Sequence, residues 1–206
     1  MTLILAAKSL DGICFLSDTN RFKCALQEYD HVQKVKLILN SGQNIALGTS
    51  GTYYSAEDVE QILRDAVNLD LYGNYFDNIT AGIRAALDYQ KHFQSSAVSF
   101  LFGIIDSSDP KQQIFVSEKG SGTITESNLA AIGSGAYYLV RTALTEKYCC
   151  SGKDETFEML SEAFNLALIL DSVNENILKG CRASLLTERG LEEQILPPGI
   201  IRLNGY

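Results

Sequence analysis

The sequence predicts an α+β fold organised as a four-layer αββα sandwich, and three observations support this prediction. First, the predicted strands and helices come in separate runs, whereas a parallel α/β sheet would alternate them. Second, each predicted helix keeps its apolar residues at helical spacing on one face, which must be buried. Third, 206 residues of which 46% are hydrophobic supply enough apolar surface for one core. Two stacked sheets with a helix pair outside each would bury all these faces, so we expect a single domain spanning residues 1–206.

The predicted strands are short apolar runs bounded by turn residues. The first two are joined by Ser9-Leu10-Asp11-Gly12, whose Asp-Gly pair favours a tight hairpin, and the last two by Glu188-Arg189-Gly190. In chain order the expected strands are 2–8, 12–18, 34–40, 44–49, 97–106, 112–117, 129–132, 181–187 and 191–195.

The predicted helices form two pairs, each placed between groups of strands. The first helix begins at Ser55, where Asp58 three positions later resembles a capping box. The others are expected over about 77–93, 136–147 and 155–171, each with apolar residues three and four positions apart. A helix pair after each group of strands completes the four layers.

Composition excludes several classes of function. A formal charge of −8 and a pI near 4.8 argue against nucleic acid or an anionic membrane as partner, because phosphates would be repelled. No apolar run approaches the roughly 20 residues that span a bilayer, and Lys8 and Asp11 interrupt the early apolar stretch, so we expect neither membrane segment nor signal peptide. Five cysteines without a CxxC pair indicate cytoplasmic thiols, mostly buried. With two histidines and no metal-ligand spacing, we expect no metal and no cofactor.

The start of the chain carries the first chemical signal. Initiator methionine is usually removed before a residue as small as Thr2, which would leave a free N-terminal threonine. Such a residue combines a hydroxyl with an α-amine of pKa about 7.7–8.0, and so a nucleophile with its own general base. The alternative is ordinary processing of a chain that happens to begin Met-Thr.

Five segments together resemble the proteasome β-subunit family, including the HslV-type peptidases, within the N-terminal nucleophile hydrolases. The resemblance runs from Thr2 to about Thr187. The segments come in the family's order: TLILAAKSLDGICFLSDTNR, KVKLI, IALGTSGTYYSAEDVEQIL, AAIGSGAYYLV and the pair Asp171-Ser172. The resemblance implies the αββα fold and peptidase activity of the N-terminal threonine.

The resemblance implies that Thr2 is the nucleophile and that Lys34 matches the family's catalytic lysine. An ammonium there would stabilise the alkoxide and, through like charge, lower the pKa of the neighbouring amine. Asp18 would pair with Lys34 and hold it protonated and oriented. The alternatives are a solvated strand lysine, with Lys36 on the same face, and a turn aspartate at a strand end.

Three further positions complete the catalytic set that the resemblance implies. Gly48 would present its backbone N–H to the developing oxyanion. Ser134 and Asp171 would hydrogen-bond the terminal amine and Thr2. The alternatives are a bulge glycine, a turn serine and a helix C-terminal aspartate. The chain departs from the family at Asn174, where a second serine is expected, so the network around the amine is altered.

The substrate-binding residues are implied by the same resemblance. Arg21, Phe22 and Lys36 fall near positions that line the family's pocket for the residue before the scissile bond, and Gly48 and Ser50 complete the set. Two cations in this wall would favour an acidic or polar residue in the substrate.

The expected function is a threonine peptidase that is activated by removal of Met1 alone. The resemblance implies a peptide or unfolded protein as substrate and a homo-oligomeric ring around the site; it is also compatible with an ATP-dependent unfoldase partner, of which the sequence carries no trace. Two alternatives stay open. An amidase or transpeptidase would use the same nucleophile, and a non-catalytic ring subunit would keep the fold without the chemistry.

Overall fold

The computed structural model describes the strands of two sheets, one helix pair and short stretches of the remaining chain. The described residues are 2–23, 28–38, 43–51, 60–62, 64–65, 81–82, 84–85, 88, 98–106, 111–118, 123–134, 138–170 and 181–196. The predicted helix that begins at Ser55 and the one predicted over 77–93 lie mostly outside this part, and their described residues are helical.

The first sheet has five antiparallel strands in the order β10-β1-β2-β11-β12. Its strands are β1 (Ile4–Ser9), β2 (Gly12–Asp18), β10 (Leu129–Ile132), β11 (Cys181–Thr187) and β12 (Gly190–Leu196). The predicted hairpin turn at Asp11-Gly12 is confirmed: β1 pairs with β2 from Ile4↔Ser17 to Ser9↔Gly12. Gly12 has φ +148° and leaves no room for a Cβ beside the Leu186 carbonyl, so the turn requires glycine.

The second sheet also has five antiparallel strands, in the order β5-β6-β7-β8-β9. Its strands are β5 (Val35–Leu37), β6 (Gln43–Ser50), β7 (Ser99–Asp106), β8 (Gln112–Ser117) and β9 (Thr125–Ser127). The sequence predicts all of these except β9, whose three residues are too short and too polar to give an apolar pattern.

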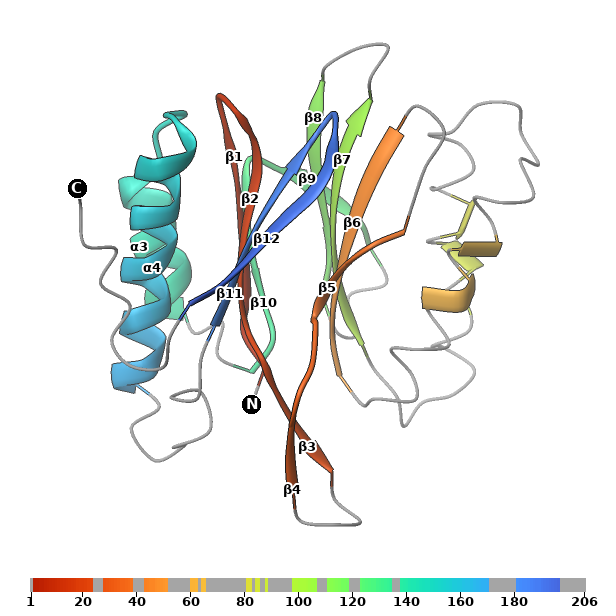
Figure 1. Cartoon of the computed structure of the whole chain (residues 1–206), viewed down its shortest axis with the longest axis horizontal. Helices are drawn as coiled ribbons and strands as arrows, with labels where there is room; N and C mark the ends of the chain where they lie inside the picture. Colours follow the sequence, from red (N-terminus) through yellow and green to blue (C-terminus); the bar gives the residue numbers. More distant parts are fainter. Residues whose placement is uncertain are drawn as a thin grey trace.

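A two-stranded hairpin, β3 (Asn20–Lys23) with β4 (Glu28–His31), was not predicted. It projects from the body at the end where the N-terminus lies (Figure 1). The backbone N–H of Val32 donates to the carbonyl of Thr19 at 2.7 Å and closes the base of this hairpin.

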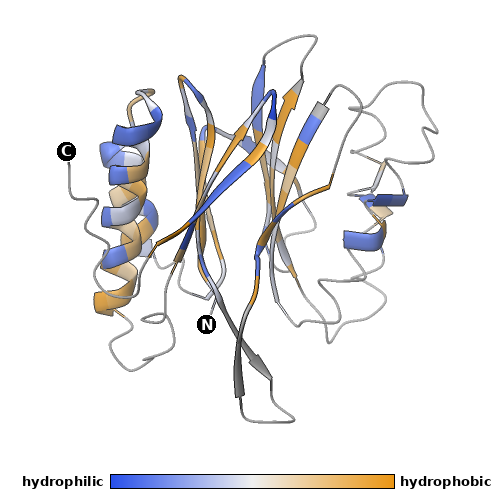
Figure 2. Cartoon of the chain, in the orientation of Figure 1, coloured by the Kyte–Doolittle hydropathy of each residue, from blue (hydrophilic) through white to orange (hydrophobic). Residues whose placement is uncertain are grey.

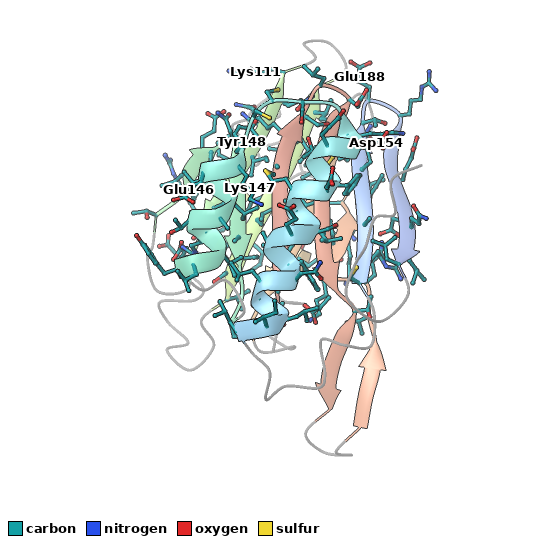
Figure 3. The ribbon with its side chains drawn as sticks, turned by 90° about the vertical axis from the view of Figure 1, so that its left-hand side faces the viewer. Lys111, Glu146, Lys147, Tyr148, Asp154 and Glu188 are labelled. Atoms are coloured by element: carbon teal, nitrogen blue, oxygen red, sulfur yellow. The ribbon has the colours of Figure 1, made fainter. Side chains whose placement is uncertain are left out.

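Helices α3 (Tyr138–Lys147) and α4 (Lys153–Leu170) cover the outer face of the first sheet (Figure 1). Asp11, in the turn between β1 and β2, caps α4: its carboxylate accepts the Lys153 N–H at 2.7 Å, where the helix dipole favours a negative charge. Figure 3 shows Tyr148, which follows α3, and Asp154 near the end of the body away from the β3–β4 hairpin. No helix in the described part of the chain is long and apolar enough to cross a membrane.

Buried apolar side chains form three layers between these elements. One packs α3 and α4 against the first sheet, one fills the space between the sheets, and one lies on the far face of the second sheet, where Ile62 packs against it. Figure 2 shows hydrophobic residues along the strands of both sheets and on the helices. The fold is therefore α+β, with helices, first sheet and second sheet stacked in that order.

The described cysteines are free thiols, but only half of them are buried. Cys14 and Cys181 lie in the layer between the first sheet and the helices, whereas Cys149 and Cys150 are exposed after α3. Burial raises the pKa of both Cys14 and Cys181 from 9.0 to about 12.

Candidate active site

Four residues predicted for catalysis meet at one end of the first sheet. Thr2 precedes β1, Asp18 ends β2, Ser134 follows β10, and Lys34 precedes β5 of the second sheet. Because β1 lies between β2 and β10, Thr2 has Asp18 on one side and Ser134 on the other. Lys34 reaches this group from the opposite sheet.

Lys34 links the Thr2 hydroxyl to a buried carboxylate. Its Nζ lies 3.1 Å from Thr2 Oγ1 and 2.6 Å from Asp18 Oδ2. Both ionic side chains are almost out of water, 8% exposed for Lys34 and 0% for Asp18. Burial lowers the pKa of Lys34, and the charge and hydrogen bond of Asp18 oppose that shift. The ion pair aims the ammonium at the threonine hydroxyl.

Asp18 is fixed by the backbone of the first strand as well as by the lysine. Its Oδ1 accepts the Leu3 N–H at 2.7 Å, and its own N–H donates to the Leu3 carbonyl at 3.1 Å. Burial raises the pKa of Asp18, whereas the Lys34 ammonium and the Leu3 N–H favour its charged form. Leu3, the residue after Thr2, thus orients the carboxylate that orients the lysine.

The other side of Thr2 is set by Gly133 and Ser134. The Thr2 nitrogen donates to Ser134 Oγ at 3.2 Å; it is an amide in the full chain and would be the α-amine once Met1 is removed. Gly133 has φ +103°, and a Cβ there would lie 2.1 Å from the Thr2 carbonyl oxygen and 3.2 Å from Ser50 Oγ. Sequence analysis missed Gly133, although its place in a Gly-Ser-Gly turn was a signal for a constrained backbone.

Gly48 lies close to the lysine segment but on the side that faces the first sheet. It pairs with Val35, the residue after Lys34, and a Cβ there would come within 3.2 Å of the Ile4 side chain. Ser50, at the end of β6, lies near Gly133 and so near the backbone of Thr2. These two predicted residues therefore stand at the edge of the site.

Lys36 is already engaged in an ion pair that was not predicted. Its Nζ lies 2.7 Å from Glu60, which also accepts from Arg64 at 2.8 Å. Burial disfavours the charged form of Glu60, but hydrogen bonds from both cations outweigh burial and lower its pKa. The Glu60–Arg64 spacing of four residues was the sequence signal for part of this network.

The structure does not describe the side chains of the remaining predicted residues. Arg21 and Phe22 lie in β3, of which only the backbone is described. Asp171 and Asn174 lie outside the described residues.

Comparisons with known proteins identify the family and agree with the fold. The chain belongs to the proteasome subunit family, whose model matches residues 2–179. Among solved structures, an Anbu (Gly-1) mutant from Hyphomicrobium sp. strain MC1 superposes with a TM-score of 0.76 at 12% sequence identity, covering 96% of this chain and 88% of that one. At this identity the likeness shows the shared fold alone. No curated protein matches the chain.

Proposed function

We propose that the chain is a threonine peptidase of the proteasome type, which cleaves peptide bonds with the Thr2 hydroxyl once Met1 is removed. The contact of Lys34 Nζ with both Thr2 Oγ1 and Asp18 carries this proposal. A buried ammonium held 3.1 Å from a hydroxyl by a dedicated carboxylate has a clear chemical use, stabilising negative charge on that oxygen. It has little structural use, because two buried charges cost more than an apolar pair.

In the proposed reaction Thr2 Oγ attacks the substrate carbonyl and its proton passes to the α-amine. The Lys34 ammonium lowers the pKa of that amine below its usual 7.7–8.0 by like charge, so the free base is present near neutral pH. Ser134 Oγ holds the amine, and the Gly48 N–H receives the oxyanion. The α-ammonium formed in this way then gives its proton to the departing amine of the substrate, which leaves an ester on Thr2 and the α-amine again as free base. Water hydrolyses this ester, with the α-amine again as base, and restores the hydroxyl.

The proposal extends to residues and assembly around this centre. Asp171 assists the amine, and Arg21, Phe22, Lys36 and Ser50 contribute to the substrate side. The chain is one domain over residues 1–206, with helices at 55–67 and 77–93 forming the fourth layer of an αββα sandwich. We further propose that peptides and unfolded proteins are the substrates and that the subunits form a homo-oligomeric ring.

Two measurements test the peptidase. Intact mass of the protein from its native host should be lower by one methionine, because an acylated nitrogen cannot serve as base. Thr2→Ala should abolish peptide cleavage while assembly, measured by sedimentation, is unchanged, and Thr2→Ser should keep part of the activity because it retains the hydroxyl. Retained Met1, or full activity of Thr2→Ala, contradicts the proposal.

The alternatives give different outcomes in the same system. An amidase or transpeptidase would transfer a labelled peptide acyl group to an added amine in place of water, so the ratio of the two products separates these activities. A non-catalytic ring subunit would assemble normally and show no turnover in either assay.

A further inference from the structure

The segment that carries Lys34 has little support from its own sheet. Residues 32–34 lie outside any strand, and the following β5 has three residues at the edge of the second sheet. An edge strand of this length is held by few ladder hydrogen bonds. The position of the lysine must therefore depend on contacts beyond the sheet.

One such contact comes from Gln33, directly before the lysine. Its Nε2 donates to Glu193 Oε1 at 2.6 Å, across 160 residues of sequence. Glu193 belongs to β12 of the first sheet, the sheet that also carries Asp18. This hydrogen bond joins the lysine-bearing segment of one sheet to the aspartate-bearing sheet.

Glu193 is itself held in place by β11. Arg182 Nη1 lies 2.9 Å from Glu193 Oε2, and Ser184, which pairs directly with Glu193, approaches it at 3.5 Å. The Arg182 and Glu193 side chains are only 20% and 24% exposed, so solvent weakens this ion pair less than one on the open surface. Arg182 is preceded in β11 by Cys181, which pairs with Asp18.

We propose that Glu193 is a positioning residue of the Thr2 site, which ties Gln33, and through it Lys34, to the sheet that presents Asp18. This inference rests on the proposed function insofar as the geometry serves catalysis. Ion-pair geometry at a reacting oxygen is sensitive, since displacement by about 1 Å can cost on the order of 100-fold in rate. When the Gln33–Glu193 contact is lost, the Val32–Thr19 hydrogen bond at the base of the β3–β4 hairpin still supports the lysine segment. We therefore expect a loss of rate smaller than about 100-fold.

The kinetic test compares Glu193→Ala, Glu193→Gln, Gln33→Ala and the control Glu192→Ala. We expect Glu193→Ala to lower kcat about tenfold with KM changed less than about twofold, because the lysine acts on chemistry rather than on binding. Glu193→Gln keeps an acceptor for Gln33 and should recover part of kcat. The double variant Gln33→Ala/Glu193→Ala should lower kcat no more than Glu193→Ala alone, because both substitutions remove the same hydrogen bond.

Glu192 supplies the matched control. It is the neighbouring glutamate on β12 and is exposed. It pairs with Leu185, which lies in the layer that faces the helices, so strand alternation places the Glu192 side chain on the face of the sheet opposite to that of Glu193. Glu192→Ala should leave kcat unchanged. An unchanged kcat in Glu193→Ala, or equal losses in both variants, overturns the proposal.

A readout that needs no peptidase activity keeps the proposal separate from the proposed function. Hydrogen–deuterium exchange of the peptide covering residues 32–37 reports local opening of the lysine segment. We expect exchange at least about threefold faster in Glu193→Ala and in Gln33→Ala than in the wild type or in Glu192→Ala. If the wild type cleaves no peptide but this pattern appears, the tether stands and the peptidase fails. Unchanged exchange in Glu193→Ala overturns the tether whatever the activity.

Discussion

Lys34 and Asp18 form an ion pair 2.6 Å long in which the carboxylate is fully buried and the lysine is 8% exposed. The two residues come from different sheets, so the pair also joins the sheets at the end where Thr2 lies. The stability of the protein and the chemistry of the Thr2 hydroxyl therefore depend on the same two side chains, Lys34 and Asp18.

Removing the charge of Asp18 should show this dependence. Asp18→Asn leaves the buried ammonium without a counter-charge, so we expect a loss of about 3 kcal/mol of unfolding free energy and a further fall in the pKa of Lys34. Urea unfolding measures the first, and peptide turnover should fall as well. The control is Glu162→Gln in the exposed Lys147–Glu162 pair, which should cost less than about 0.5 kcal/mol. Equal stability losses in the two variants would contradict the prediction.

Gly133→Ala should displace Thr2. The added Cβ would meet the Thr2 carbonyl at 2.1 Å, so Thr2 must move and turnover should fall by about 100-fold or more. Gly190→Ala is the matched control, because Gly190 also has a positive φ, +123°, but nothing lies within 4 Å of its Cβ position. Both variants carry backbone strain of about 1–3 kcal/mol, measured by urea unfolding, but only Gly133→Ala should lose activity. Activity lost equally in both would sink the steric explanation.

Glu60→Gln should change the substrate preference. Glu60 neutralises Lys36 in the folded chain. The wild type should therefore prefer acidic substrate residues less strongly than it would if both Arg21 and Lys36 were free cations in the pocket wall. Removing the carboxylate frees the lysine charge, and kcat/KM for a peptide with glutamate before the scissile bond should rise about threefold or more relative to its glutamine counterpart. A matched peptide pair measures this ratio. An unchanged ratio would show that Lys36 does not reach the substrate.

Alkaline pH should destabilise the protein through two buried thiols. Cys14 and Cys181 ionise near their ordinary pKa of 9.0 when unfolded but only at about 12 when folded. The folded state therefore binds more protons between these values, and its stability falls as pH rises from about 9 to 12. From pH 8 to pH 10 the two thiols together should cost about 2–3 kcal/mol. Urea unfolding of the Cys14→Ala/Cys181→Ala double variant should lack this part of the pH slope; an unchanged slope would assign it to other groups.

The sequence predicts those parts of the fold whose signal is local. The β1–β2 turn needs Asp11-Gly12, and the described strands of the two sheets except β9 follow apolar runs, so these parts were predictable. The β3–β4 hairpin was missed because its strands, Asn20–Lys23 and Glu28–His31, carry charged residues and no apolar alternation. The Val32–Thr19 hydrogen bond closes the base of this pair, and no local pattern predicts that contact.

The site divides in the same way. The resemblance located Thr2, Asp18, Lys34 and Ser134, which the structure brings together. The roles of Gly133 and Glu193 come from contacts across 131 and 160 positions of the chain. The Gly-Ser-Gly turn marks Gly133 as a constrained position but not its contact with Thr2, and no local pattern marks Glu193. Pairing of Lys36 with Glu60 was hidden for the same reason, since a strand lysine and a helix glutamate meet only after folding.

The β3–β4 hairpin separates Asp18 from Lys34 along the chain, yet the Val32–Thr19 hydrogen bond closes its base at 2.7 Å. This hydrogen bond holds the two ends of the hairpin together beside Asp18 and Lys34. Residues inserted into or deleted from the arm would alter how far it extends, while the ion pair keeps its geometry. The length of the arm and the geometry of the ion pair can thus vary independently, and a segment grafted between β3 and β4 should leave the Lys34–Asp18 distance unchanged.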